Sequence, residues 1–288
     1  MELACQVVPD IPTFAVDDGF TYAIPEGMTV SVGSIVRVRV SGRRRRGFVT
    51  AIFPRPDGRR LLDVDGVSGS APTFDEHLLE SARRVAEHYV APLSNVLGRT
   101  VPPNVPRRSR RSTAPVRSTE PGPVMVTGSW APHHRAVMDA LERSGPRPIV
   151  VPTDVEAQAL ADALATAEEP VGRVLTASSA QSNAATTAAW VSASQDTDTV
   201  MVGTRETMLW ASAAKRGWIV VEDGRRVMKS PATPTLQVRD VLLERLRNEG
   251  GTLDVIGPVP TLEVMAVADV TTIPPGRSWS PVEIVDRT

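Results

Sequence analysis

The sequence predicts two different kinds of fold in succession, a small β-rich module and then a parallel α/β lobe. Residues 35–40 alternate arginine with β-branched apolar residues, which is typical of a half-buried strand. From residue 124 onward, short apolar segments alternate with helical patterns, which favours a parallel sheet flanked by helices. Residues 101–122, between the two parts, are rich in Pro, Arg, Ser and Thr and lack periodicity. We therefore expect an α+β domain, a flexible basic linker and an α/β domain.

The β-rich part should contain three strands followed by a helix. The strands are expected at residues 4–8, 35–40 and 47–53, with a turn at Ser41-Gly42 and an arginine run leading into the third. Short strands broken by Gly and Pro favour a small barrel or a strongly bent sheet. Asp75 can cap a helix whose apolar residues recur at helical spacing as far as Tyr89. Pro92 ends that helix or starts a short turn over residues 93–97.

The α/β part alternates strands and helices throughout, without an internal repeat. Its strands are expected at residues 124–127, 148–152, 174–177, 199–203, 217–221 and 253–257. Its helices are expected at residues 136–143, 155–167, 184–193 and 239–249. Connections of this kind place helices on both faces of a parallel sheet.

Length and composition exclude several classes of protein. A chain of 288 residues, 41% hydrophobic and 23% charged, suits a soluble globular protein of two domains. No apolar stretch approaches the ~20 residues of a membrane span, and the first residues lack the features of a signal peptide. Cys5 is the single cysteine, which excludes an internal disulfide and a cysteine-based zinc site. We expect a cytoplasmic protein without a membrane partner.

The positive charge is concentrated in the first part of the chain and is almost entirely arginine. Residues 1–120 hold 17 Arg against 13 Asp and Glu, whereas residues 121–288 hold 15 Lys and Arg against 20 acidic residues. Lys215 and Lys229 are the two lysines of the chain. Because a guanidinium forks onto phosphate, this asymmetry favours an anionic partner for the first part.

Three segments together resemble the primosomal replication-restart proteins of the PriA type. They are GFTYAIPEG with GSIVRV (residues 19–27 and 33–38), ARRVAEHYVAPL (82–93), and VGTR, WIVVED, RDV and GPVPTLE in order between residues 202 and 263. The resemblance implies a β-rich domain at 1–104 that recognises a 3′ strand end, a linker at 105–120 and a RecA-like helicase lobe at 121–288. It also implies forked or single-stranded DNA as a partner, together with single-strand-binding protein and helicase-loading proteins of the primosome. A winged-helix domain that family members usually insert is replaced here by the linker.

The same resemblance assigns a pocket for the 3′ end. Phe20 and Tyr22 fall on its aromatic positions and Gly42 on its glycine, while Thr21 replaces an acidic residue. No lysine matches the basic pocket residue near Leu62. Phe20 and Tyr22 should share one strand face, where they either stack unpaired bases or pack beneath the barrel.

The arginine run is the clearest signal for a partner. It comprises Arg43, Arg44, Arg45 and Arg46, and Arg37, Arg39, Arg59 and Arg60 could extend it into a basic face for phosphates. The alternative is a solvated turn that protects a strand edge from aggregation. Arginines of the linker (Arg107, Arg108, Arg110, Arg111 and Arg117) either add non-specific phosphate contacts or only keep a tether in solution.

The expected nucleotide site lacks its motifs. Where a phosphate loop should follow residues 124–127, the sequence has GSWAPHH (128–134), without a second glycine or a lysine. Glu222-Asp223-Gly224 stands where an Asp-Glu pair would bind magnesium. Lys229-Ser230 has the wrong glycine spacing for a phosphate loop, and His133 and His134 are expected at a helix start rather than as metal ligands.

We therefore predict a fork-DNA-binding protein of replication restart that uses neither ATP nor magnesium and has no helicase activity of its own. One alternative is an ATP-dependent 3′–5′ helicase with a divergent nucleotide site. A second alternative is a protein-interaction scaffold with no DNA role, in which the arginines only provide solubility.

Overall fold

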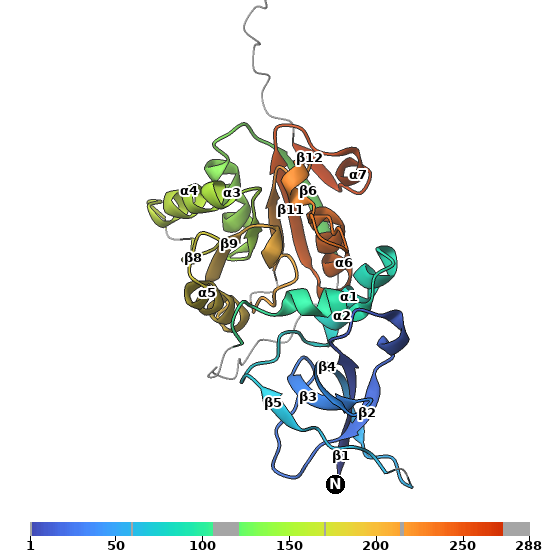
Figure 1. Ribbon diagram of the computed structural model, residues 1–288. Helices are drawn as coiled ribbons and strands as arrows, with labels where there is room; N and C mark the ends of the chain where they lie inside the picture. Colours follow the sequence, from blue (N-terminus) through green and yellow to red (C-terminus); the bar gives the residue numbers. More distant parts are fainter. Residues whose placement is uncertain (1, 59, 106–120, 170, 214–215, 273–288) are drawn as a thin grey trace, which may run out of the picture.

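The computed structural model describes residues 2–58, 60–105, 121–169, 171–213 and 216–272. An antiparallel sheet of five strands is followed by a parallel sheet of seven strands with helices, consistent with an α+β domain and then a RecA-like lobe (Figure 1). The predicted fold class is confirmed. The predicted linker at 105–120 lies almost entirely outside the described residues.

The N-terminal sheet closes on itself into a small barrel-like structure. Its strands are β1 (Leu3–Pro9), β2 (Phe20–Ala23), β3 (Ile35–Val40), β4 (Arg43–Pro54) and β5 (Gly66–Ser68), in the order β2-β1-β4-β3-β5. Ala23, at one edge, exchanges backbone hydrogen bonds with Leu62 and Val64, just before the strand at the other edge. The two edges are thereby joined, and Tyr22 and Val64 face an apolar interior.

The β3–β4 hairpin corrects the predicted position of the arginine run. Its turn consists of Ser41 and Gly42 alone, both with positive φ (49° and 77°), as a two-residue hairpin turn requires. Strand β4 therefore begins at Arg43 and is 12 residues long. Residues 43–46 pair with β3 and belong to the strand rather than to a turn that leads into it.

Two helices connect the barrel to the second sheet. Helix α1 (Glu76–His88) is capped by Asp75, whose side chain accepts a hydrogen bond from the backbone N–H of Leu78, as predicted. Helix α2 (Leu93–Leu97) follows, and it continues into a short 3-10 turn, η2 (Gly98–Thr100). Both helices lie between the barrel and the parallel sheet (Figure 1).

The second sheet is parallel throughout. Its strands are β6 (Pro121–Gly128), β7 (Ile149–Val150), β8 (Arg173–Ala177), β9 (Thr199–Gly203), β10 (Gly217–Val221), β11 (Gly251–Gly257) and β12 (Val270–Thr272). Their order is β12-β6-β11-β10-β7-β9-β8. The helices are α3 (His134–Ser144), α4 (Asp154–Ala165), α5 (Asn183–Gln195), α6 (Val238–Glu249) and the short α7 (Leu262–Met265).

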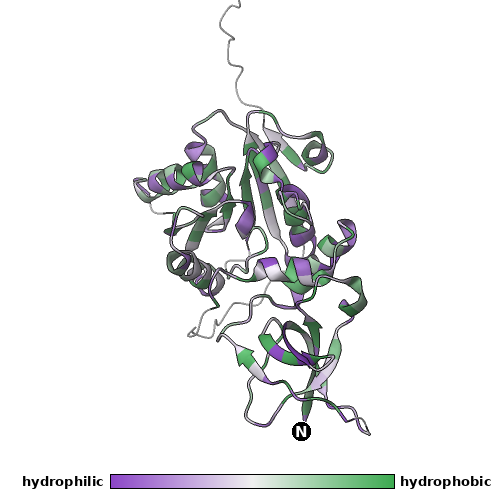
Figure 2. Cartoon of the chain, in the orientation of Figure 1, coloured by the Kyte–Doolittle hydropathy of each residue, from purple (hydrophilic) through white to green (hydrophobic). Residues whose placement is uncertain are grey.

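Helices cover both faces of this sheet. Helices α3 and α4 pack on one face, and α5 and α6 pack on the other, together with α1. Figure 2 shows hydrophobic strands at the centre and hydrophilic residues on the outer sides of the helices. Strands β9 and β10 are nearly continuous apolar runs because both of their faces are buried.

The barrel, α1 and α6 share one apolar core. The cluster takes Phe48 from β4, Leu78 from α1, and Val241 and Leu242 from α6. Polar contacts follow the same junction. The Tyr89 hydroxyl donates to the Asp240 carboxylate at 2.7 Å, and the Gln237 backbone N–H donates to the Tyr89 oxygen at 2.9 Å.

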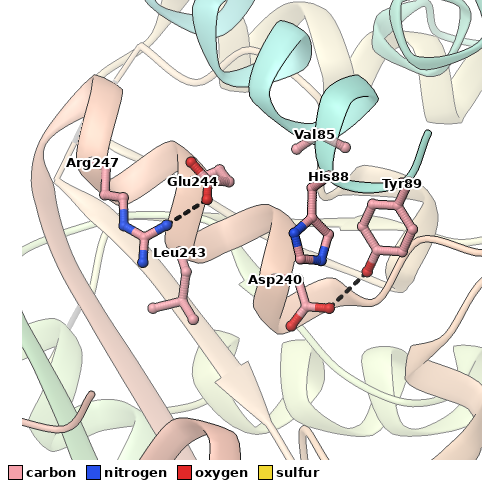
Figure 3. A pocket seen from close by; sticks show the side chains of 7 residues that line it. All are labelled: Val85, His88, Tyr89, Asp240, Leu243, Glu244 and Arg247. Carbon is pink, nitrogen blue, oxygen red and sulfur yellow. Dashed lines mark hydrogen bonds and ion pairs between the residues drawn. The ribbon is translucent and has the colours of Figure 1, made fainter. Parts of the chain in front are cut away.

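A cavity of about 170 Å³ beside Tyr89 is lined by α1 and α6 (Figure 3). Burial and the hydrogen bond to Asp240 raise the pKa of the Tyr89 hydroxyl, so the hydroxyl stays protonated and keeps its donor role. Within the described part of the chain, no helix has the length and apolar character needed to cross a membrane.

Candidate nucleic-acid interface

Phe20 and Tyr22 lie on the same face of β2, as their spacing predicts, but only one of them is accessible. Tyr22 is 3% exposed, belongs to the barrel core and donates its hydroxyl to the backbone oxygen of Arg39 at 2.9 Å. Phe20, two residues before Tyr22 on the same face, is 42% exposed. Barrel closure buries the Tyr22 ring, so Tyr22 follows the alternative in which the ring packs beneath the barrel. Phe20 alone offers a face on which a base could stack.

Thr21 points to the opposite face from these rings and is already hydrogen-bonded. Its hydroxyl donates to the Gln6 side-chain oxygen at 3.1 Å, and the Gln6 amide donates to the backbone oxygen of Asp18. The Thr21 oxygen keeps a lone pair that can accept a hydrogen bond. Gly42 has no atom within 4 Å of the position a Cβ would occupy, so its positive φ, rather than close packing, favours glycine there.

The hairpin arginines are divided between two faces. Arg37 lies directly opposite Arg46, and Arg39 lies directly opposite Arg44, so these four share one face. We call them the outer arginines. Arg43 and Arg45 lie opposite Val40 and Val38, and Val38 faces the barrel interior. Arg43 and Arg45 are therefore the inner arginines, on the same side of the sheet as Phe20.

Two carboxylates partly neutralise the outer arginines. Arg46 approaches Asp10 at 2.7 Å, while Asp65 lies 3.3 Å from Arg44 and 3.7 Å from Arg39. The structure records no ion pair for Arg43 or Arg45 with the described residues. All the arginines of the run are exposed. The sequence does not predict the ion pairs of Asp10 and Asp65, because these pairs depend on the strand register of the closed barrel.

The structure does not place the other predicted basic residues, Arg59, Arg60 and the linker arginines, at the hairpin. Arg60 is exposed in the loop beyond the opposite end of β4, so the strand separates it from Arg43 along the chain. Arg59 and the arginines of the linker lie outside the described residues. Among the described residues, the predicted basic surface is therefore formed by the arginines of the β3–β4 hairpin.

A second polar site lies at the carboxyl edge of the parallel sheet, where open α/β sheets bind ligands. His133 is the N-cap residue of α3, which follows β6, and Glu222 directly follows β10. The His133 Nε2 lies 3.0 Å from the Glu222 Oε1, and Arg225 lies 2.9 Å from the Glu222 Oε2. Arg225 also binds Glu156 of α4. Side chains of the protein therefore occupy both oxygens of the Glu222 carboxylate.

The neighbouring carboxylate is also engaged. Asp223 is 1% exposed and accepts a hydrogen bond from the Thr261 hydroxyl at 2.6 Å. Burial raises the pKa of Asp223, and the hydrogen bond from Thr261 only partly offsets this. Burial also opposes ionisation of Glu222, but the hydrogen bonds from His133 and Arg225 outweigh it and leave the Glu222 pKa below its usual value. Glu222 has a left-handed backbone (φ 52°), a conformation that is unfavourable for this residue type and is held by these contacts.

The remaining sequence candidates, Lys229 and Ser230, lie beyond β10. Lys229 is exposed, and the adjacent Ser230 is buried and accepts a hydrogen bond from Arg99 at 2.7 Å. The pair follows a short 3-10 helix instead of lying between a strand and a long helix. Among the described residues, no three His, Cys, Asp or Glu side chains are grouped as metal ligands would be. The sequence does not predict the contact between His133 and Glu222, because this contact depends on the order of the strands in the sheet.

The N-terminal part of the chain resembles a known protein family. Residues 6–102 match the sequence model of the PriA 3′DNA-binding domain (3′BD). This region is therefore similar to the 3′ DNA-binding domain of PriA-type proteins. A comparison with curated proteins finds no match to the chain.

The PriA 3′BD match begins within β1 and ends just after η2, so it covers the barrel and both connecting helices. Phe20, Thr21, Tyr22 and the complete arginine hairpin lie inside it. The match supports DNA as a partner of this region. The RecA-like lobe begins beyond the matched residues.

Proposed function

We propose that this protein binds forked DNA in replication restart through its PriA-type domain and does not act as an ATP-driven helicase. The observation that carries the proposal is the 3′BD match at residues 6–102, within which the hairpin exposes its run of arginines. The α/β lobe then serves as a scaffold for partners, such as single-strand-binding protein and helicase-loading proteins. The match weighs against the alternative of a protein-interaction scaffold without a DNA role.

The inner side of the barrel offers two complementary contacts for DNA. Phe20 provides an exposed ring for stacking, and Arg43 and Arg45 lie on the same side of the sheet without carboxylate partners among the described residues. Stacking on an aromatic ring and charge along the backbone are the two contributions that single-strand binders combine. This side of the barrel is our candidate contact for the strand end.

The lack of ATP chemistry is supported by the geometry at the carboxyl edge. A triphosphate placed after β6 would find no lysine in GSWAPHH, and Pro132 removes one backbone donor. It would also face the carboxylates of Glu222 and Glu156, which Arg225 already pairs. The residues present therefore do not fit ATP and magnesium. Binding of a fluorescent ATP analogue separates this proposal from the helicase alternative.

Replacement of Arg43–Arg46 by alanine is expected to weaken binding of forked DNA at low salt by about tenfold or more. The slope of log affinity against log salt should fall by about 0.9 for every arginine that no longer binds a phosphate, because fewer counterions are released. Fluorescence anisotropy of a labelled fork over a salt series measures both quantities.

Two control variants accompany this test. Lysine at the same four positions should preserve the slope, and alanine at the exposed lobe arginines Arg135, Arg173 and Arg226 should have little effect. If the alanine hairpin variant keeps the affinity and slope of the wild type, the arginines are only a solvated strand edge.

Selectivity for a free 3′ end is expected to be small in the wild type. Thr21 offers a neutral hydroxyl, and charge-assisted hydrogen bonds are roughly twice as strong as neutral ones. Thr21→Asp should raise the affinity ratio of a free to a dideoxy-terminated 3′ end by roughly fivefold, a gain of about 1 kcal/mol. This requires the Gln6 amide to turn its nitrogen toward the new carboxylate.

Thr21→Val is the matched control, since it keeps the shape but removes the hydroxyl. It should bring the ratio close to one. Equal binding of both ends by wild type and Thr21→Asp would remove the strand-end pocket from the proposal and leave a general fork binder.

A further inference from the structure

The two faces of the arginine hairpin differ in what surrounds them. The inner arginines, Arg43 and Arg45, share their side of the sheet with exposed Phe20. The outer arginines have Phe48 as their aromatic neighbour, which is fully buried beneath Arg46 with the guanidinium 5.7 Å from the ring centre. The outer face therefore offers charge without an accessible ring.

The outer arginines form an energetically unfavourable arrangement on their own. Arg37 faces Arg46 and Arg39 faces Arg44, and like charges directly opposite on neighbouring strands destabilise a sheet. Asp10 and Asp65 supply two negative charges for these four positive ones. The outer face thus keeps an excess of positive charge, which a further anion would neutralise.

The spacing suits a polyanion rather than a single phosphate. Opposed side chains start about 5 Å apart, and residues i and i+2 along a strand start roughly 6.7 Å apart. The four guanidinium groups can therefore spread over several phosphates of a backbone. A face without stacking rings fits the backbone of a duplex better than unpaired bases, because single strands are usually held by stacking as well.

We propose that the outer arginines form a second DNA-binding surface for the phosphate backbone of a duplex arm, and that Asp10 and Asp65 compete with this backbone for them. The inference rests on the proposed function, in that the same domain must bind DNA. The inference adds a contact with duplex DNA that is separate from the strand-end contact. Asp10 and Asp65 would lower the affinity of this second contact. The ion pairs suit such exchange because they are exposed: the Arg44 side chain is 56% exposed and the Arg39 side chain 62%.

The test measures binding of a labelled blunt duplex whose 3′ ends are dideoxy-terminated, so that no free 3′ hydroxyl contributes. The Asp10→Asn, Asp65→Asn double variant should bind this duplex about 2- to 10-fold more tightly, as expected when exposed ion pairs no longer compete. Its salt slope should steepen by about 0.9 for each arginine released to a phosphate. Asp63→Asn is the matched control, since Asp63 lies in the same segment and the structure records no ion pair for it with the described residues.

A second pair of variants tests the division of the hairpin independently of the acidic residues. Arg44→Ala, Arg46→Ala should weaken duplex binding by severalfold more than Arg43→Ala, Arg45→Ala, although both remove the same charge. Wild-type protein that binds no fork would refute the proposed function itself. If the wild type binds the fork, two results would refute only the second surface. One is that Asp10→Asn, Asp65→Asn binds the duplex no more tightly than Asp63→Asn. The other is that the two arginine pairs lose equal affinity for the duplex.

Discussion

Purified protein mixed with ATP, magnesium and forked DNA is expected to release no phosphate above a control without protein, and to separate no strands. Phosphoryl transfer depends on a lysine, a metal ion and a preformed backbone cradle. GSWAPHH supplies neither the lysine nor the glycine cradle, and the Glu222 oxygens are occupied by His133 and Arg225. Removal of one preorganised interaction of this kind costs ~100- to 1,000-fold in rate, and several are absent together.

A coupled phosphate-release assay with and without fork DNA measures this turnover. Glu222→Gln is the diagnostic variant, because Glu222 stands where the Asp-Glu pair of a magnesium site is expected. Turnover that co-purifies with the protein and disappears in Glu222→Gln would overturn the proposal and favour the helicase alternative. Turnover that persists unchanged in Glu222→Gln would be assigned to a contaminating ATPase.

Asp254→Ala should strongly destabilise the α/β lobe. Asp254 lies on the interior strand β11 and is fully buried. It binds buried Arg147 at 2.6 Å and the partly exposed Arg143 at 2.7 Å. Removal of the carboxylate would leave the Arg147 charge buried and uncompensated, a loss of about 3–5 kcal/mol. For a protein of this size, the loss corresponds to a melting temperature lower by about 6–20 °C.

Thermal denaturation followed by circular dichroism measures this effect. Arg143→Ala is the matched control, since its side chain is 41% exposed and its ion pair should contribute little. The double variant Arg147→Met, Asp254→Leu should recover most of the stability, because apolar residues of similar volume replace the pair. A melting temperature unchanged by Asp254→Ala would contradict a structural role for the pair.

The sequence predicts the parallel sheet more accurately than the barrel. Strands β9 and β10 have the predicted bounds, because uninterrupted apolar runs between turn residues identify strands buried on both faces. Strand β7 is reduced to Ile149–Val150 between two prolines, although the pattern favours a longer strand. Strands β5 and β12, of three residues each, are not predicted because so short a segment has no measurable period.

The candidate sites show where sequence reasoning reaches its limit. The arginine run has no alternation and therefore resembles a turn, whereas its half of β4 is a strand exposed on both faces. The burial of Tyr22 follows from the bridge between Ala23 and residues 62–64, a contact about 40 positions away in the chain. The pairing of His133 with Glu222 spans 89 positions and depends on β11 lying between β6 and β10. Such contacts depend on topology, which local patterns do not encode.

The apolar core shared by the barrel, α1 and α6 determines how captured DNA would be presented. Phe48 and Leu78 on one side, and Val241 and Leu242 on the other, belong to a single cluster, so the barrel cannot swivel freely relative to the parallel sheet. A strand end held beside Phe20 would lie at a constant distance and angle from the lobe. Under the proposed scaffold role, a protein that docks on the lobe would meet the fork in one orientation.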